Sequence, residues 1–154
     1  MTDIVKINNP LWVANLAPLI VDFLEKIQLP NINYHSMIAM FQRTAQIGGE
    51  LVELWAVLEE KEPVGFAHWC VRDIPMVGTT HMDFLYSKAN RRDIIKEILM
   101  KWKEFGEKHN SPFYMYDVVN NPKLVQHFKN LAEFFGFESV QQPYLPHIAR
   151  MKHG

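Results

Sequence analysis

Residues 79–110 read TTHMDFLYSKANRRDIIKEILMKWKEFGEKHN, and they determine how the rest of the chain can be arranged. The first part is rich in β-branched and aromatic residues, which favours a strand. After Asn90 the apolar residues change to helical spacing, at Ile95, Ile98, Leu99, Trp102 and Phe105. Asn90 is the expected N-cap of this helix. A strand that leads into a helix start rich in arginine predicts an anion-binding turn; an ordinary strand–helix unit with a solvated basic turn is the alternative.

Composition narrows the class of protein. The chain has 154 residues and 48% hydrophobic content, which predicts one domain over residues 1–154 with a real core. A formal net charge of -1 argues against a nucleic-acid partner, and the absence of a long apolar run argues against a membrane partner. Residues 1–9 lack the features of a signal peptide, and Cys70 is the single cysteine, so we expect a cytoplasmic protein.

The order of the predicted elements indicates an α/β fold. Two helices follow a short first strand, three strands come next, and a helix, a strand and a helix follow. Residues 137–140 and 147–151 are expected to add final strands. The prediction is a mixed central sheet of six to seven strands with helices on both faces, in the order β-α-α-β-β-β-α-β-α-β-(β).

Three segments carry a resemblance to a known family. They are EKEPVGFAHW at 60–69, HMDFLYSKANRRDIIKEIL at 81–99 and NNPKLVQHFKNLAEFFGFE at 120–138. Together with the element order, they resemble the hairpin, the cofactor-binding unit and the closing helix of the GNAT acetyltransferase superfamily. The resemblance covers nearly the whole chain. It implies a sheet that opens into a V between its fourth and fifth strands, with acetyl-CoA in the gap.

The resemblance also implies which residues hold acetyl-CoA. The expected set runs from the fourth strand through the helix start to the closing helix: Leu85, Tyr86, Arg91, Arg92, Asp93, Ile94, Ile95, Lys96, Asn120, Asn121 and Phe128. The family's loop reads Arg/Gln-x-x-Gly-x-Gly/Ala. If Arg91 is aligned with the family's arginine, Ile94 and Lys96 occupy the two glycine positions. If Arg92 is aligned with that arginine instead, Ile95 and Glu97 occupy them. Because β-branched residues disfavour a positive φ, this chain departs from the family at the phosphate loop.

Candidate catalytic residues lie on the fourth and fifth strands. His81 and Asp83 alternate along the fourth strand, so both side chains point to one face and are candidates for the base. His68 on the neighbouring strand is expected nearby. Phe128 stands where many members of the family carry a tyrosine acid, so Tyr116 or Tyr114 is the candidate replacement. The alternative is a polar pair at a sheet edge beside packing tyrosines.

The sequence and its resemblance to the family lead to two alternative hypotheses about function. One is an acyl-CoA-dependent N-acyltransferase that transfers acetyl from acetyl-CoA to a small-molecule or peptide amine. The other is a catalytically inactive GNAT-like binding or structural subunit, in the manner of a phage or accessory protein. No metal site is expected, since the seven histidines do not show zinc-ligand spacing. An exposed last strand would allow a homodimer or another protein assembly.

Overall fold

The computed structural model of the chain describes residues 1–27, 32–74, 77–111, 113–116 and 122–138. The strands are β1 (Thr2–Lys6), β2 (Val52–Glu59), β3 (Glu62–Ile74), β4 (Val77–Ser87) and β5 (Phe113–Tyr116). The helices are α1 (Ala17–Lys26), α2 (Tyr34–Ile47), α3 (Arg92–Lys108) and α4 (Pro122–Phe134), with short 3₁₀ segments η1 (Pro10–Leu16) and η2 (Lys88–Asn90). This order confirms the predicted α/β fold, with five described strands rather than six to seven.

One mixed sheet organises these elements, in the spatial order β1-β2-β3-β4-β5. Neighbours are antiparallel up to β4, and β5 pairs with β4 in parallel. The β2–β3 hairpin turns through two residues, Glu60 and Lys61, which both have positive φ (51° and 69°). That turn matches the right-handed twist of the flanking strands. The predicted hairpin is therefore confirmed.

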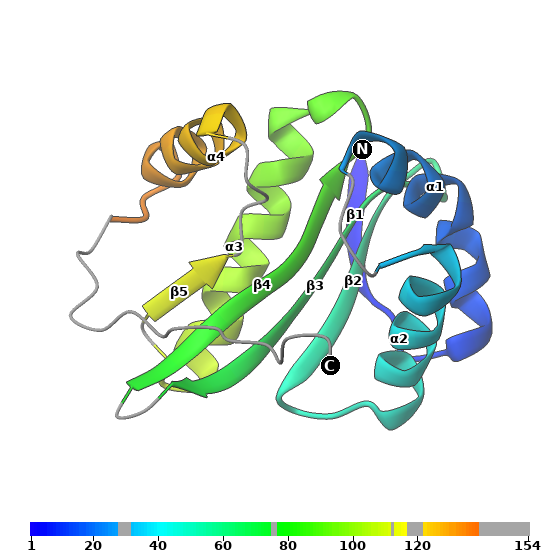
Figure 1. Cartoon of the computed structure of the whole chain (residues 1–154), viewed down its shortest axis with the longest axis horizontal. Coiled ribbons are helices and arrows are strands. Elements are labelled where there is room, and N and C mark those ends of the chain that lie inside the picture. Colours follow the sequence, from blue (N-terminus) through cyan, green and yellow to red (C-terminus); the bar gives the residue numbers. More distant parts are fainter. Residues whose placement is uncertain (28–31, 75–76, 112, 117–121, 139–154) are drawn as a thin grey trace, which may run out of the picture.

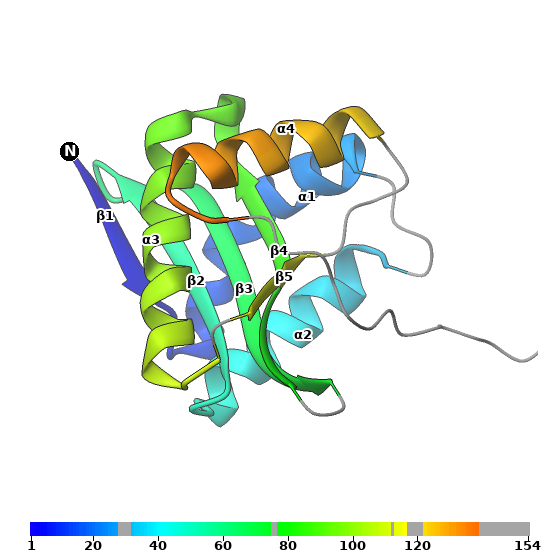
Figure 2. The same cartoon turned by 90° about the vertical axis from the view of Figure 1, so that its left-hand side faces the viewer.

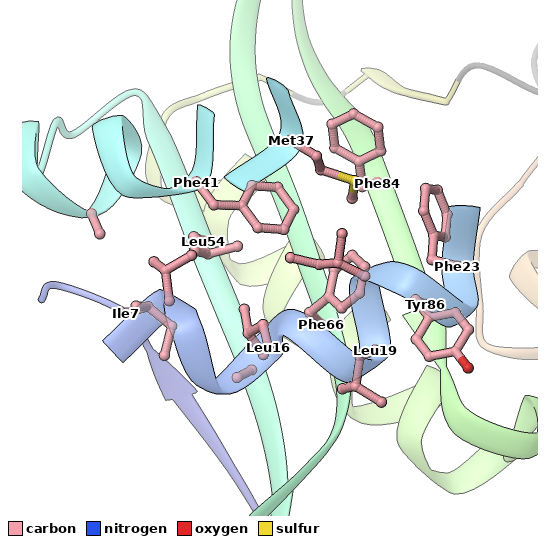
Figure 3. Close-up of a cluster of buried hydrophobic side chains, with 14 residues drawn as sticks. Ile7, Leu16, Leu19, Phe23, Met37, Phe41, Leu54, Phe66, Phe84 and Tyr86 are labelled. Atoms are coloured by element: carbon pink, nitrogen blue, oxygen red, sulfur yellow. The ribbon is translucent and has the colours of Figure 1, made fainter. Parts of the chain in front are cut away.

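Helices cover both faces of the sheet, with α1 and α2 on one face and α3 on the other (Figures 1 and 2). The core on the α1/α2 face is aromatic, and Phe23, Phe41, Phe66 and Phe84 meet there edge to face (Figure 3). Such aromatic pairs add to the free energy gained from burial alone. The core on the α3 face includes Trp69, Trp102 and Leu131, so α4 packs on the α3 side.

Local signals explain where most helices begin and end. Pro18 lies in the first turn of α1, as predicted, and Gly48 ends α2 in the left-handed conformation. At the start of α2, Asn33 and Ser36 form a reciprocal capping box. The prediction of Asn90 as the N-cap of α3 is wrong. Arg91 holds that position without a side-chain cap, because Asn90 has a left-handed φ of 49° and belongs to η2.

The predicted strand at 137–140 is also not supported in its first half. Phe137 and Glu138 lie outside any strand, after a turn in which Gly136 has a φ of 96°. Phe137 packs instead on Trp102 and Tyr114. Residues 139–140 and the predicted strand at 147–151 lie outside the described residues. In the described part of the chain, no helix has the length and apolar content needed to cross a membrane.

A close approach at Gly65 sets the position of α3 on the sheet. A Cβ at Gly65 would lie 2.8 Å from Cγ2 of Ile94 and 2.9 Å from the carbonyl oxygen of Tyr86. Both distances are shorter than van der Waals contact, so only glycine allows the first turn of α3 to come this near to β3. The start of α3 therefore sits directly against the sheet at the end of β4.

We expect Gly65→Ala to lower the free energy of unfolding by about 1–3 kcal/mol, because the Cβ meets backbone that cannot easily move. Gly49→Ala is the matched control, since a Cβ there meets nothing within 4 Å. The control should change the free energy of unfolding by at most about 1 kcal/mol. Urea unfolding of both variants measures the difference. Equal stability of the two variants would contradict this account of α3.

Candidate functional site: a cleft along the open edge of β4

A cleft of about 830 Å³ runs beside the second half of β4. Its floor is formed by residues 82–87 of β4, and its lining reaches Phe23 of α1 on one side and Phe128 and Leu131 of α4 on the other. The pairing of β5 with β4 covers only Thr79 to Met82 in the described residues. Residues 83–87 of β4, beyond Met82, line the cleft, which agrees with the predicted V-shaped opening.

A β-bulge marks the point where the edge becomes open. Met82 pairs with Trp69 and Phe84 pairs with His68, so Asp83 is an extra residue on β4. Met82 packs in the core on the α3 face, whereas Phe84 packs in the core on the α1/α2 face. Bulges of this kind re-aim a side chain and often lie beside functional sites.

The carboxylate of Asp83 is the centre of a buried polar network. Oδ2 lies 2.8 Å from Nδ1 of His68, and Oδ1 lies 2.8 Å from Nδ1 of His81. The guanidinium of Arg72 donates to Oδ1 at 2.9 Å. Only 11% of the Asp83 side chain is exposed, and 5% of each histidine side chain. The predicted pairing of His81 with Asp83 on one face is confirmed, and His68 joins it.

These contacts decide the protonation state of Asp83. Burial alone would raise the pKa of its carboxyl, but the hydrogen bonds from His68 and His81 outweigh burial and hold the pKa well below its ordinary value. An ionised carboxylate only accepts hydrogen bonds, so both imidazoles donate through Nδ1–H. In neutral His68, Nε2 then accepts from the hydroxyl of Thr44 at 2.9 Å. Asp83 therefore fixes the tautomer of His68.

The four side chains of the network that come from β3 and β4 differ in their access to the cleft. His68, Arg72 and Asp83 line it, whereas His81 is not among the lining residues. His81 lies beside Asp83 with 5% of its side chain exposed. The candidate base that reaches the cleft is therefore His68 rather than His81.

Cys70, His81 and Asp83 could in principle hold a metal ion, because one ligand atom of each lies within 4.8 Å of the others. Arg72, however, donates to Asp83 at 2.9 Å and to the sulfur of Cys70 at 3.4 Å. A cation thus already contacts two of the three ligands, and a metal ion would be repelled by it. The expectation that no metal binds stays a prediction.

The cleft ends at the start of α3, where Ser87 and Asn90 line it. The hydroxyl of Ser87 accepts a hydrogen bond from the backbone N–H of Arg91 at 3.0 Å. Ala89 and Asn90 both have left-handed φ values, 58° and 49°. The tight turn that the family makes with glycines therefore falls before the helix in this chain, not at Ile94.

Both predicted phosphate-binding arginines have protein partners. The guanidinium of Arg91 donates to Glu59 at 2.8 Å and to Asp93 at 2.7 Å, and these contacts raise its pKa. Arg92 lies over the ring of Phe134, with Cζ 4.9 Å from the ring centroid. Since two carboxylates neutralise Arg91, its free charge toward a phosphate is small. The N-cap residue Arg91 does not cap α3 with its own side chain, whereas the carboxylate of Asp93 in the first turn accepts hydrogen bonds from the backbone N–H groups of Asp93 and Ile94.

The residues at the family's glycine positions do not crowd the turn. Ile94 is fully buried against Gly65, on the sheet side of α3. Ile95 is buried and lines the cleft, and Lys96 is exposed. None of the three has a positive φ. The obstacle that the sequence suggested at Ile94 is thus absent, because its side chain points into the core.

The other predicted site residues fall on both sides of the cleft. Leu85 and Tyr86 line it from β4, and Tyr116 and Phe128 line it from β5 and α4. The rings of Tyr116 and Phe128 are in contact, with centroids 4.2 Å apart. Burial, and to a smaller degree the charge of Glu133, raises the pKa of the Tyr116 hydroxyl, so it stays protonated at neutral pH. Asn120 and Asn121 lie outside the described residues.

Two residues of the network were missed at the sequence level. Arg72 and Thr44 both contact it, and neither stands in a family motif. A signal for Arg72 was present, since His68, Cys70 and Arg72 alternate along one strand and must share a face. Thr44 lies on α2, so its contact with His68 depends on how α2 packs on the sheet.

Comparison with known proteins supports the fold. No protein-family model matches the chain, and no curated protein matches it by sequence. Solved structures do match. One is an aminoglycoside N-acetyltransferase, AAC(6')-Iy, in complex with CoA, with a TM-score of 0.71 and 14% identity over 96% of this chain and 95% of that one.

Two further structures match over similar lengths. A predicted acetyltransferase from Clostridium acetobutylicum with acetyl-CoA has a TM-score of 0.69 and 14% identity, over 96% of both chains. A ribosomal-protein-alanine N-acetyltransferase from Brucella melitensis biovar Abortus 2308 has a TM-score of 0.69 and 14% identity, over 96% of this chain and all of that one. The chain therefore has the GNAT acetyltransferase fold, as the resemblance implied.

We expect Asp83→Asn to lower the free energy of unfolding at pH 7 by about 2–4 kcal/mol, because two imidazoles and a guanidinium lose their common anion. The folded-state pKa of Asp83 is depressed, so its contribution is complete above the ordinary value of 3.8 and is lost as the pH falls below it. The stability of the native chain should therefore fall more steeply below pH 3.8 than that of the variant. Denaturant unfolding between pH 2 and pH 7 (about the range in which a carboxyl titrates) measures both curves.

Asp22→Asn is the control for this experiment. Asp22 forms a half-exposed ion pair with Lys26 at 3.1 Å, so its loss should cost at most about 1 kcal/mol. Parallel pH curves for the native chain and Asp83→Asn would show that the Asp83 network does not stabilise the fold.

Proposed function

We propose that this protein is an acyl-CoA-dependent N-acyltransferase that moves an acetyl group from acetyl-CoA to an amine. The observation that carries the proposal is the cleft of about 830 Å³ along the open edge of β4, which ends at the start of α3. CoA and acetyl-CoA complexes among the solved structures of this fold support it. A fold alone does not define an activity, so the argument depends on the residues of the cleft.

The start of α3 fits the phosphates of acetyl-CoA. The helix dipole favours an anion there, and the carboxylate of Asp93 now accepts from the backbone N–H groups of Asp93 and Ile94, so a phosphate would have to displace it. The predicted residues Asp93, Ile94, Ile95 and Lys96 would contribute these backbone groups. Because Arg91 already pairs with Glu59 and Asp93, it would orient the turn more than neutralise the phosphates. Leu85, Tyr86 and Phe128 would contact the rest of the cofactor, and Asn120 and Asn121 stay predicted contacts.

His68 and Asp83 suit the handling of the amine. Asp83 is held ionised, which makes it a weak proton acceptor, and Arg72 already balances its charge, so its role is to orient His68. His68 can take a proton on Nε2 without losing its contact with Thr44, because a hydroxyl can accept as well as donate. We assign His68 as the proton acceptor, with the proton passing through the hydroxyl of Thr44, which gives its own proton to Nε2 and takes one up from the amine side. His81, the predicted base, would support Asp83 from the side away from the cleft.

Tyr116 suits the release of the thiol. The amine nitrogen attacks the thioester carbonyl carbon, the carbon–sulfur bond breaks, and the thiolate of CoA takes up a proton. Tyr116 lines the cleft and keeps its proton at neutral pH, so it would supply that proton. Phe128, at the position of the family's tyrosine, holds the ring of Tyr116 in place.

The organisation, location and partners of the protein are also proposed. We propose a single domain over residues 1–154, a cytoplasmic location and a small-molecule or peptide amine as acceptor. A homodimer or another assembly and a phage source stay predictions, as does the absence of nucleic-acid and membrane partners. The inactive binding subunit is the alternative, and the partners of Arg91 favour it because they reduce the charge available to a phosphate.

We expect Tyr116→Phe to lower kcat by about 10²–10⁴-fold while acetyl-CoA binding changes little, since the variant loses only the acidic hydroxyl. Free thiol released from acetyl-CoA with an amine acceptor measures kcat, and calorimetry measures cofactor binding. Tyr114→Phe is the matched control on the same strand: its hydroxyl donates to the carbonyl oxygen of Lys103 at 2.8 Å and does not line the cleft. The control should keep kcat. If acetyl-CoA does not bind at millimolar concentration, the acyltransferase proposal is contradicted, and the inactive binding subunit is the function that remains.

A further inference from the structure

The hydroxyl of Tyr86 is a buried polar group that lacks a hydrogen bond. Tyr86 is 6% exposed, and its hydroxyl oxygen has no hydrogen-bond partner in the described part of the chain. Tyr86 lines the cleft, and Figure 3 shows its oxygen at the margin of the aromatic core, pointing away from Phe66. Nε1 of Trp102 and Nε2 of His109 also lack a partner among the described residues, but neither residue lines the cleft. A ligand in the cleft would recover the free energy that the unpaired hydroxyl costs.

The ammonium group of Lys26 lies over the same ring. Nζ is 5.6 Å from the ring centroid of Tyr86, and Lys26 lines the cleft from the last turn of α1. Its ion pair with Asp22, at 3.1 Å, joins neighbouring turns of one helix, and 55% of the Lys26 side chain is exposed. A surface pair of this kind holds its partners weakly, so the long side chain can turn Nζ toward a ligand.

These two groups suit a carboxylate. A lysine ammonium only donates hydrogen bonds, and a tyrosine hydroxyl can donate one. A group that satisfies both must therefore accept, and an anionic oxygen accepts most strongly because its bond to an ammonium is charge-assisted. Lys26 supplies one positive charge, which matches a carboxylate better than the nearly doubled charge of a phosphate monoester.

The position of this pair favours the acceptor over the cofactor as the source of the carboxylate. Tyr86 packs in the core on the α1/α2 face, whereas α3, whose start is proposed to bind the cofactor phosphates, covers the opposite face (Figure 2). His68 shares the face of Tyr86, since its ring stacks on Phe41 of α2. His68 pairs with Phe84, two residues before Tyr86 on β4, so the two positions are about 7 Å apart along the strands.

We propose that Lys26 and the hydroxyl of Tyr86 bind a carboxylate of the acceptor, which is thus an amine that also carries an acidic group. This inference rests on the proposed acetyl transfer and names its acceptor class. The amine would lie toward His68, and the carboxylate would accept from Lys26 and Tyr86. The hydroxyl of Tyr86 is thereby assigned to the acceptor, while its backbone stays a predicted contact of the cofactor.

Pentylamine and 5-aminopentanoate test the inference, because they have the same number of carbon atoms and differ by one carboxylate. Calorimetry of each amine, with and without CoA, measures the two dissociation constants. The amino acid should bind at least about tenfold more tightly, as expected for a charge-assisted hydrogen bond. Lys26→Gln and Tyr86→Phe should each remove most of this difference, whereas Lys26→Arg keeps the charge and should keep the ratio.

Tyr86→Phe has a second readout, in stability. Removal of a buried hydroxyl that has no partner should leave the free energy of unfolding unchanged or raise it. A hydroxyl with a structural role would instead make the variant less stable than the native chain. Urea unfolding measures the difference, and a clear loss of stability would overturn the inference.

Lys101→Gln is the matched control for the lysine. Nζ of Lys101 lies 5.6 Å from the ring centroid of Trp55 and 3.1 Å from the carboxylate of Glu104, so its contacts resemble those of Lys26. Lys101 is on α3 and does not line the cleft. The control should therefore keep the native ratio of the two dissociation constants.

The inference is overturned if 5-aminopentanoate binds no more tightly than pentylamine, or if either Lys26→Gln or Tyr86→Phe keeps the native ratio. If Lys26→Gln weakens acetyl-CoA binding and leaves the ratio unchanged, the anion belongs to the cofactor and the assignment to the acceptor is wrong. Acetyl-CoA binding to the native chain is measured separately. If the ratio behaves as expected and acetyl-CoA does not bind, the proposed transfer fails while the carboxylate site stands. If acetyl-CoA binds and the ratio is absent, the carboxylate site fails alone.

Discussion

The ionised carboxylate of Asp83 is the interaction on which the site depends. A buried carboxylate is stable only with strong donors around it, and His68, His81 and Arg72 supply three of them within 2.9 Å. These donors come from two neighbouring strands, so they hold the bulge at Asp83 in one geometry. The open edge of β4 begins at that bulge. One polar network therefore stabilises the fold and shapes the cleft at the same position.

A second constraint places the anion-binding end of the cleft. Gly65 lets the first turn of α3 approach the sheet, and Ile94 fills the space so created. The left-handed residues needed for the tight turn are Ala89 and Asn90, one turn earlier than the glycines of the family's loop. This chain thus keeps a helix start beside the cleft with a different sequence. The charge at this helix start also differs from the charge expected from the family's loop, because Glu59 forms an ion pair with Arg91.

Local patterns predicted most of the fold and part of the site. Helical spacing predicted α3, and alternation along β4 placed His81 and Asp83 on one face, as observed. The pairing of Arg91 with Glu59 could not be predicted, because the two residues are 32 positions apart and meet only through the sheet register. The bulge was missed for the same reason, since a register shift depends on both strands. The residue type of Asn90 predicts a helix cap, but its left-handed φ of 49° excludes that role.

The central claim is that acetyl-CoA lies against the open edge of β4 and the start of α3. Amide hydrogen exchange with and without acetyl-CoA tests it most directly, because exchange is read residue by residue along the backbone. The account predicts slower exchange at residues 83–87 and in the first turn of α3 when acetyl-CoA is present, with β1 unchanged. Unchanged exchange at residues 83–87 with millimolar acetyl-CoA, or slowing confined to other strands, would contradict it.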